Sequence, residues 1–335
     1  MSLRGYILRR VIYIVPVMLG ITLMNFTLIN VSPGDPVIVR LGLLKCESPE
    51  CYNTAYNNEA IQMGLLNNEM YTVPWFERYI DFVNDLLHFD LGNSWYNTQA
   101  GQGIPISQLI RERAVYTITL NVLSFIFSLL LATAIGVVSA TRQNSIWDRS
   151  LTIAMLLGYS MPLFWLAKLL MLLSYSLFNF TGVANKDAFK TPLFLNPSFY
   201  KYLILPTLAL TLGGLVFMAR LVRSQLLEIL RQDYVTTAKA KGLDNRAVIY
   251  KHAFRNGLLP IVTIIGSSLP GLLSGSVMVE SVFGWPGLGT IFLEGALFRD
   301  YPLMMATNTI FPLLFLIARL LTDITYVFID PRIKY

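Results

Sequence analysis

The sequence predicts an all-α, polytopic membrane protein with six transmembrane helices. Of the 335 residues, 54% are hydrophobic and only 14% are charged, and the mean hydropathy is +0.55. Since an ordinary soluble domain is about 25% charged, most of this chain is expected to face lipid. A helical span needs about 20 apolar residues. Six segments meet that requirement: 11–31, 114–140, 151–180, 202–219, 257–279 and 301 to about 328.

The charges in the connections set the expected orientation. With the N-terminus inside, the inside connections hold fifteen Lys and Arg residues against five Asp and Glu, whereas the outside connections hold nine against fourteen. Cytoplasmic loops carry the excess of Lys and Arg, so both termini are expected in the cytoplasm. The net charge of +6 is explained by this excess of Lys and Arg in the inside connections. The chain is therefore expected to contact membrane lipid and not to bind nucleic acid.

The first span, 11–31, follows the basic residues Arg4, Arg9 and Arg10. A basic stretch before an apolar one also begins a secretory signal. Here, however, the apolar run is longer than a signal core, and no small-x-small cleavage site follows it. We therefore expect residues 1–31 to form an N-terminal tail and a retained helix.

Residues 32–113 form an expected extracytoplasmic insert. Within it, apolar residues recur at helical spacing over 73–91 with acidic residues between them, which predicts an amphipathic helix. Gly92 is expected to cap the C-terminus of that helix. The stretch 46–68 is rich in Asn and Glu, which predicts loops with short helices and not an independent domain.

Cys46 and Cys51 are the only cysteines, and both lie in the insert. The four intervening residues permit a small disulfide loop, which an oxidising exterior would preserve; two unpaired thiols are the alternative. The only histidines, His88 and His252, fall on opposite sides of the membrane in this topology. A metal site is therefore not expected.

The core, residues 114–335, contains five spans, and two of them carry charges. Lys168 lies in the span 151–180. It either lines a substrate path, where it would meet a carboxylate, or it pairs with an acid on a neighbouring span or snorkels. Arg319 and Asp323 lie four residues apart in the last span, hence on one helix face, and are expected to form a structural pair.

Residues 220–257, the polar segment, interrupt the apolar spans. Asp233 is expected to cap a short helix over 234–241, and Gly242 is expected to end it in the left-handed conformation. Asp244 can cap a second helix that runs through His252. Apolar residues on this basic element would contact either anionic lipid or a docked protein. They are Val235, Ala238, Leu243, Val248, Ile249 and Phe254.

At these residues the polar segment resembles the cytoplasmic coupling segment, often called the EAA loop, of permease subunits in binding-protein-dependent ABC importers. The strings DYVTTAKAKGL and HAFRNGLLP are most similar to the dipeptide and oligopeptide branch. In the general pattern, Glu-Ala-Ala precedes a glycine, and Ile-x-Leu-Pro follows it. Here Thr236, Thr237 and Ala238 take the first place, Gly242 takes the glycine place, and a string from His252 to Arg255 takes the last.

Further strings resemble the same subunits, in order, across nearly the whole chain. Near the start are ILRR and SPGDP, and the insert contains WFERYIDFVNDLLHFDLGNS, in which Phe89 stands where the family has glycine. Later come MPLFWLA, VFGWPGLG, RDYP and the terminal DPRIKY. The resemblance implies the type I ABC importer permease fold in a prokaryotic cytoplasmic membrane.

The resemblance also implies the partners and the coupling residues. The expected partners are a homologous second permease subunit, two cytoplasmic ATPase subunits and an extracytoplasmic binding protein that delivers di- or oligopeptides, with oligosaccharides or nickel as alternative solutes. The ATPases would contact residues of the polar segment: Asp233, Tyr234, Ala238, Ala240, Lys241, Gly242, Leu243, His252, Arg255 and Asn256.

No catalytic residue or bound cofactor is expected on this chain. The sequence contains no GxxxxGK[ST] string and no Gly-Lys dipeptide, so ATP and magnesium would bind the ATPase subunits. The alternative of another class is an ion-coupled secondary transporter, which needs coupling carboxylates near the membrane midplane. Only Asp323 is a candidate for that role, and it lies towards the inner end of its span.

Overall fold

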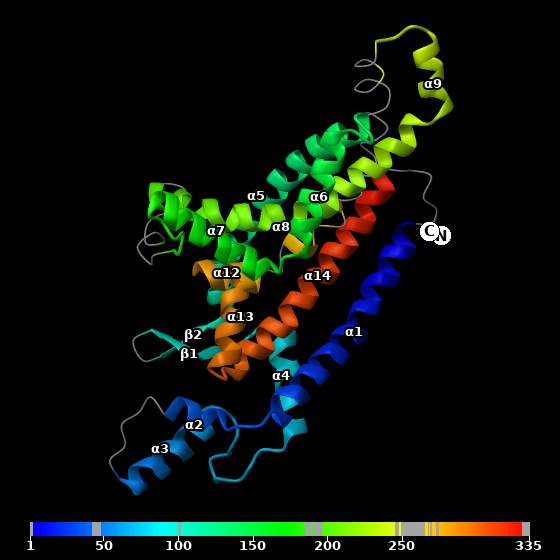
Figure 1. Cartoon of the computed structure of the whole chain (residues 1–335). Helices are drawn as coiled ribbons and strands as arrows, with labels where there is room; N and C mark the ends of the chain where they lie inside the picture. Colours follow the sequence, from blue (N-terminus) through cyan, green and yellow to red (C-terminus); the bar gives the residue numbers. More distant parts are fainter. Residues whose placement is uncertain are drawn as a thin grey trace. The chain divides into compact units, whose positions relative to one another are not determined.

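The computed structural model describes residues 3–41, 48–99, 102–184, 189, 196–244, 248, 265–266, 268, 270–272 and 275–329. These residues form helices and one short β-hairpin (Figure 1). The chain divides into two units. Unit 1 consists mainly of Met1–Val115 and Gly287–Ile317, and unit 2 of Tyr116–Pro286 and Ala318–Lys334. Two long helices, α5 (Ile106–Thr141) and α14 (Tyr301–Ile329), contribute to both.

In unit 1, α1 (Leu3–Val31) lies beside α14 (Figure 1), and the side chain of Asn25 donates a hydrogen bond to the carbonyl of Asn308 at 3.3 Å. The amphipathic helix α4 (Trp75–Leu87) packs on the C-terminal half of α1, where the hydroxyls of Thr22 and Tyr79 are 3.1 Å apart. An apolar cluster fixes the three helices together, and its buried members are Phe26, Ile29 and Met305. The remaining elements of the unit are α2 (Pro36–Leu41), α3 (Pro49–Gln62), α4 (Trp75–Leu87), β1 (Asn93–Gln99), β2 (Gln102–Pro105) and α13 (Leu288–Leu297).

The predicted helix over 73–91 is α4, but its end differs from the prediction. The helix stops at Leu87, and Phe89 turns the chain with a left-handed φ of +59°. Gly92 also has a positive φ, +68°, but it lies in the following turn, where its N–H donates to Asp90. Gly92 is therefore not the cap. A left-handed position explains why a glycine suits position 89 in the family pattern.

The insert has a small core of its own. Val37 and Leu41 of α2 pack on Ala60 and Met63 at the end of α3. The stretch expected to hold only short helices thus contains the 14-residue α3, whose N-cap Ser48 accepts a hydrogen bond from the N–H of Cys51. Cys51 is disulfide-bonded, whereas Cys46 lies outside the described residues.

A side-chain hydrogen bond joins α3 to the start of α2. The Tyr56 hydroxyl donates to Asp35 at 2.6 Å, and this bond to a carboxylate raises the pKa of Tyr56 to about 12. The other oxygen of Asp35 accepts from the N–H of Val37 at 2.8 Å. Asp35 therefore anchors the first turn of the insert from both sides.

Unit 2 is a bundle of apolar helices. α7 (Leu163–Phe178), α8 (Pro197–Leu230) and α12 (Val277–Phe283) enclose a buried cluster of Ala167, Leu205, Ala209, Val279 and Phe283. α5 and α8 approach closely, because a Cβ on Gly136 would lie 2.7 Å from Val222. The unit also contains α6 (Ile146–Ser160), α9 (Asp233–Ala240) and the end of α14.

Four described helices are long and apolar enough to cross a membrane: Gly5–Val31, Ile106–Thr141, Pro197–Leu230 and Tyr301–Ile324. Two bent helix pairs raise the number to six if each pair forms one span. The sequence segments for the first, second and last spans are thus confirmed as helices. The segment 257–279 lies largely outside the described residues.

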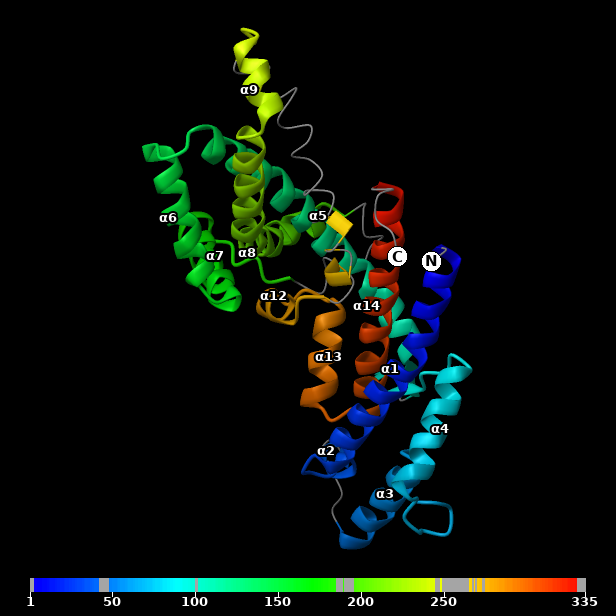
Figure 2. The same ribbon diagram turned by 90° about the vertical axis from the view of Figure 1, so that its right-hand side faces the viewer.

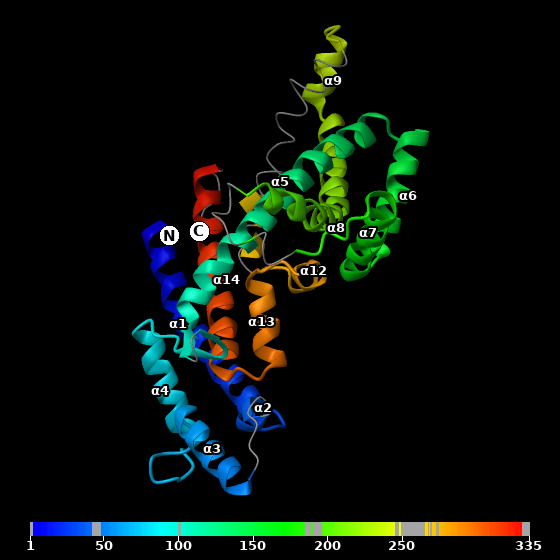
Figure 3. The same ribbon diagram turned by 90° about the vertical axis from the view of Figure 1, so that its left-hand side faces the viewer.

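The predicted third span, 151–180, is not one continuous helix. α6 and α7 meet at an angle of 106° at Met161 and Pro162 (Figure 3). Proline disfavours the helical conformation of the residue before it, and Met161 accordingly adopts the extended region with ψ 127°. The fourth span also differs, since α8 continues to Leu230, well into the polar segment.

Candidate functional site

Helix α8 contains the start of the polar segment and ends at Leu230, and α9 follows after a short turn (Figure 2). The carbonyl of Gln232 accepts from the N–H groups of Val235 at 3.0 Å and Thr236 at 3.2 Å. Helix α9 starts at Asp233, so Gln232 holds the cap position and the prediction of Asp233 as the cap is wrong by one residue. The Asp233 carboxylate still lies in the first turn, where negative charge is favourable.

Gly242 ends the helix as predicted. Its φ is +78°, in the region that favours glycine. The N–H of Leu243 donates to the carbonyl of Ala238 across this turn at 3.4 Å. A Cβ on Gly242 would meet no atom within 4 Å, so the backbone angle alone, not lack of space, requires glycine here.

One face of α9 packs on its own chain. Val235 and Ala238 are buried against Val137 and Ala140 of α5 and Leu226 of α8. Val248 joins the same cluster. The expectation that these apolar residues supply an external contact surface is therefore wrong for Val235, Ala238 and Val248, which attach the helix to the bundle.

The opposite face of α9 and its turn are exposed. Tyr234 is 41% exposed and Leu243 is 43% exposed, so both side chains are accessible from outside the chain. The exposed residues predicted for ATPase coupling are Asp233, Tyr234, Ala240, Lys241, Gly242 and Leu243. Of the other four predicted coupling residues, Ala238 is buried, and His252, Arg255 and Asn256 lie outside the described residues.

A buried ion pair joins α6 to α8, one of the two helices that hold α9. Arg223 of α8 donates to Asp148 of α6 through Nε and Nη2, each at 2.9 Å, in a bidentate arrangement. Ser139 of α5 also donates to Asp148, and the N–H of Asn144 donates at 3.0 Å. The Asp148 side chain is 5% exposed and that of Arg223 is 28% exposed. We call Ser139, Asp148 and Arg223 the clamp.

The sequence indicates the position of Asp148 at a helix start, but not its pairing in the clamp. Ser145 and Asp148 have the spacing of a capping box, and the Ser145 hydroxyl does accept from the N–H of Asp148 at 3.2 Å. That pattern predicts a helix start. It does not predict that the carboxylate pairs with Arg223, which is 75 residues away.

Lys168 lies on the exposed face of α7, one residue after the buried Ala167. The same face carries Phe164, Trp165 and Leu172, all about half exposed or more. Within the described ranges no acidic side chain forms an ion pair with Lys168, whereas Arg319 and Asp323 pair at 3.6 Å as predicted.

Comparisons with known proteins agree with this architecture. Residues 132–335 match the family model described as "Binding-protein-dependent transport system inner membrane component". The chain is 35% identical over 339 residues to the oligopeptide transport system permease protein AppB of Bacillus subtilis, with 99% of both chains covered. It is 31% identical over 352 residues to the dipeptide transport system permease protein DppB of Escherichia coli, with 98% of both covered.

A solved structure supports the fold. The inward-facing MetNI methionine ABC transporter matches with a TM-score of 0.54 and 19% identity, covering 68% of this chain and 100% of that one. At this identity the likeness shows the fold alone. The type I importer permease arrangement is therefore confirmed, with one short β-hairpin added to the all-α prediction among the described residues.

Proposed function

This chain belongs to the family of binding-protein-dependent transport system inner membrane components, and we propose that it is the permease subunit of an ATP-driven importer of short peptides. The full-length likeness to permeases named for oligopeptide and dipeptide transport carries the proposal. The apolar helices make it a multi-pass membrane protein.

The exposed face of α9 is the proposed contact for the ATPase subunits. The helix is held to α5 and α8 by its buried face, while the side chains of Tyr234 and Leu243 are exposed. Because the whole sequence lacks a Gly-Lys dipeptide, the nucleotide would bind the partner subunits and not this chain. Movement of α9 on ATP binding would then bias the helices between two states.

The other partners follow from the same family membership. They are a homologous second permease and a binding protein outside the membrane. The charge distribution supports cytoplasmic termini and a cytoplasmic α9, with the insert on the outer side. We assign no catalytic residue and no cofactor to this chain.

Co-purification with transport tests the proposal. The tagged chain should bring down a second permease and two ATPase subunits in fixed stoichiometry. In proteoliposomes, the complex should accumulate a radiolabelled tripeptide only when ATP and the binding protein are both supplied. Peptide uptake by the chain alone, driven by an ion gradient, would show that the protein is a secondary transporter instead.

Lys168 is the proposed cation of the substrate path. A charge on an apolar face within the membrane is costly in contact with lipid, so this face should meet protein or water. Lys168→Met is expected to reduce uptake of an acidic tripeptide about tenfold, the size of one lost charge-assisted contact, and to leave a neutral tripeptide unaffected.

Lys201→Met is the matched control for Lys168. The Lys201 ammonium already lies 4.6 Å from the centre of the Phe180 ring, so its loss should not distinguish the two peptides. Equal losses of acidic and neutral uptake in Lys168→Met would assign Lys168 a structural role.

A further inference from the structure

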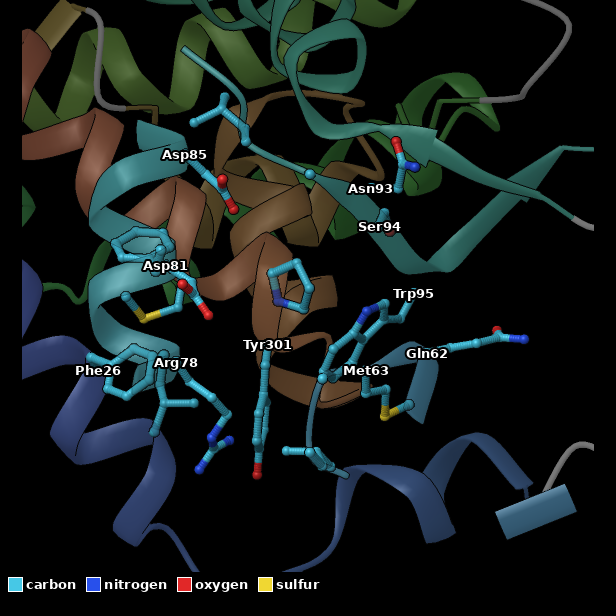
Figure 4. A pocket seen from close by; sticks show the side chains of 18 of the residues that line it. Phe26, Gln62, Met63, Arg78, Asp81, Asp85, Asn93, Ser94, Trp95 and Tyr301 are labelled. Carbon is cyan, nitrogen blue, oxygen red and sulfur yellow. The ribbon is translucent and has the colours of Figure 1, made fainter. Parts of the chain in front are cut away.

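Unit 1 contains a cavity of about 610 Å³ between α1, α4, the start of β1 and the start of α14 (Figure 4). Its lining residues belong to unit 1, which includes the insert, whereas α9 and the clamp belong to unit 2. Its size is within the range of small-ligand sites. Neither the proposed ATPase contact at α9 nor Lys168 involves this cavity.

Three of the charged groups of the cavity line one side of α4. Arg78, Asp81 and Asp85 follow one another at helical spacing, and Figure 4 shows them in that order along the helix, opposite Trp95 and Tyr301. Arg78 and Asp85 are seven residues apart, which corresponds to about 10 Å along a helix.

These charges are not neutralised by one another. The Nε of Arg78 is buried and has no hydrogen-bond partner among the described residues, and burial lowers the pKa of this guanidinium. Asp81 and Asp85 form no ion pair within the described ranges, although Arg78 lies on the same helix. A buried donor without a partner is costly, and a ligand that supplies an acceptor would remove that cost.

Aromatic and amide groups make up much of the remaining lining. The rings of Trp95 and Tyr301 lie 5.8 Å apart, and those of Phe26 and Phe82 lie 6.5 Å apart. Gln62 and Asn93 add amide groups that can donate or accept hydrogen bonds. Such walls accept varied side chains, and the amides can pair with a ligand backbone.

An unpaired cation and unpaired anions along one wall are complementary to a ligand with both charges. We propose that this cavity binds a short zwitterionic peptide, whose terminal ammonium contacts Asp81 and Asp85 and whose terminal carboxylate contacts Arg78. At about 3.5 Å per residue, two or three residues span the length from Arg78 to Asp85. The assignment to peptides rests on the proposed function, whereas the need for both charges rests on the cavity.

The cavity also predicts a preference among peptides. Asp90 lines it too, so three carboxylates face one guanidinium. The excess negative charge should favour peptides that carry an additional Lys or Arg. The site would thus hold basic peptides more tightly than acidic ones, through contacts of this chain alone.

Equilibrium binding of radiolabelled trialanine tests the proposal. The full chain, with the membrane subunits that co-purify but no binding protein, is placed in lipid nanodiscs. N-acetyl-trialanine and trialanine amide should each bind about tenfold more weakly than trialanine, because each loses one charge-assisted contact. Equal binding of all three peptides, or no saturable binding of trialanine, would overturn the proposal.

Variants connect each terminus to its residue. In Arg78→Met, trialanine and trialanine amide should bind equally, while trialanine should still bind more tightly than N-acetyl-trialanine. Arg78→Lys should still bind trialanine more tightly than its amide. In Asp81→Asn with Asp85→Asn, trialanine and its N-acetyl form should bind equally. Glu77→Gln, on the same helix but outside the cavity lining, is the matched control and should change neither ratio.

The outcomes separate this site from the proposed function. If the complete system imports peptides but the membrane part binds none, the cavity proposal fails and the importer stands. If trialanine binds with these preferences but ATP drives no uptake, the cavity stands and the importer proposal fails.

Discussion

Arg223→Met is expected to lower the thermal stability of the protein and to separate ATP hydrolysis from transport. Removing the guanidinium leaves Asp148, only 5% exposed, as a buried carboxylate without its cation. Breaking a buried pair from one side costs about 3 kcal/mol or more. Dye-monitored unfolding and the ratio of peptide imported to ATP hydrolysed are the measurements.

The effect on coupling follows from where the clamp lies. Ser139 stands between Val137 and Ala140, which contact α9, and Arg223 precedes Leu226 by about one turn. The clamp therefore fixes the helices that hold α9 in register. Without it, ATP hydrolysis should continue while peptide uptake falls at least about tenfold, since α9 no longer moves with α5, α6 and α8 as one body.

A charge reversal and a second arginine control this experiment. The double variant Arg223→Asp with Asp148→Arg should recover part of the stability and of the transport ratio, which a general packing defect would not allow. Arg319→Met breaks a longer pair, at 3.6 Å, in which Arg319 is 48% exposed, so it should destabilise the protein less than the loss of the bidentate pair does. If Arg223→Met unfolds no earlier than Arg319→Met, the clamp is not a stabilising element.

Gly242→Val is expected to release the ATPase subunits while the permease remains inserted in the membrane. A left-handed backbone at φ +78° costs a non-glycine residue about 1–2 kcal/mol, and a β-branched one most of all. The turn between Ala238 and Leu243 would rearrange, and with it the exposed residues that are proposed to contact the ATPases. Quantitative pull-down of the ATPase subunits measures the loss.

Gly64→Val is the matched control for Gly242. Gly64 has φ +67°, and a Cβ there would also meet nothing within 4 Å, but it lies in the insert. The backbone strain is therefore similar, and ATPase association should be retained. Gly242→Asn should also retain most of the association, because asparagine tolerates this conformation. Unchanged pull-down of the ATPases by Gly242→Val would show that the turn is not part of the contact.

The features that the sequence predicted are local ones. The start of α14 at Tyr301 and the left-handed turn at Gly242 depend on neighbouring residues, so composition and spacing were sufficient. The break at Pro162 was available from the same kind of signal, but the apolar run around it concealed the bend. The clamp could not be predicted, because its partners are brought together only by packing of three helices.

The apolar face of α9 shows a second limit. Spacing marked Val235 and Ala238 as a contact surface, yet sequence alone does not say whether the contact belongs to the same chain or to another protein. The structure shows that Val235 and Ala238 are buried against α5 and α8 of the same chain. The exposed Tyr234 and Leu243 then became the better candidates for an external partner.

The length of α8 has a mechanical consequence. Its 34 residues extend for about 50 Å at 1.5 Å per residue, whereas the hydrocarbon core is about 30 Å thick. We expect α8 to act as a lever, with α9 at its C-terminal end. Pro206, which donates no backbone hydrogen bond, lies nearer the N-terminal end, and we expect any bending of α8 to occur there. A displacement of α9 would then move α8 with it, because α8 is a continuous helix. A force applied to α9 outside the bilayer would thereby reach the interior of the bilayer without local unfolding of α8.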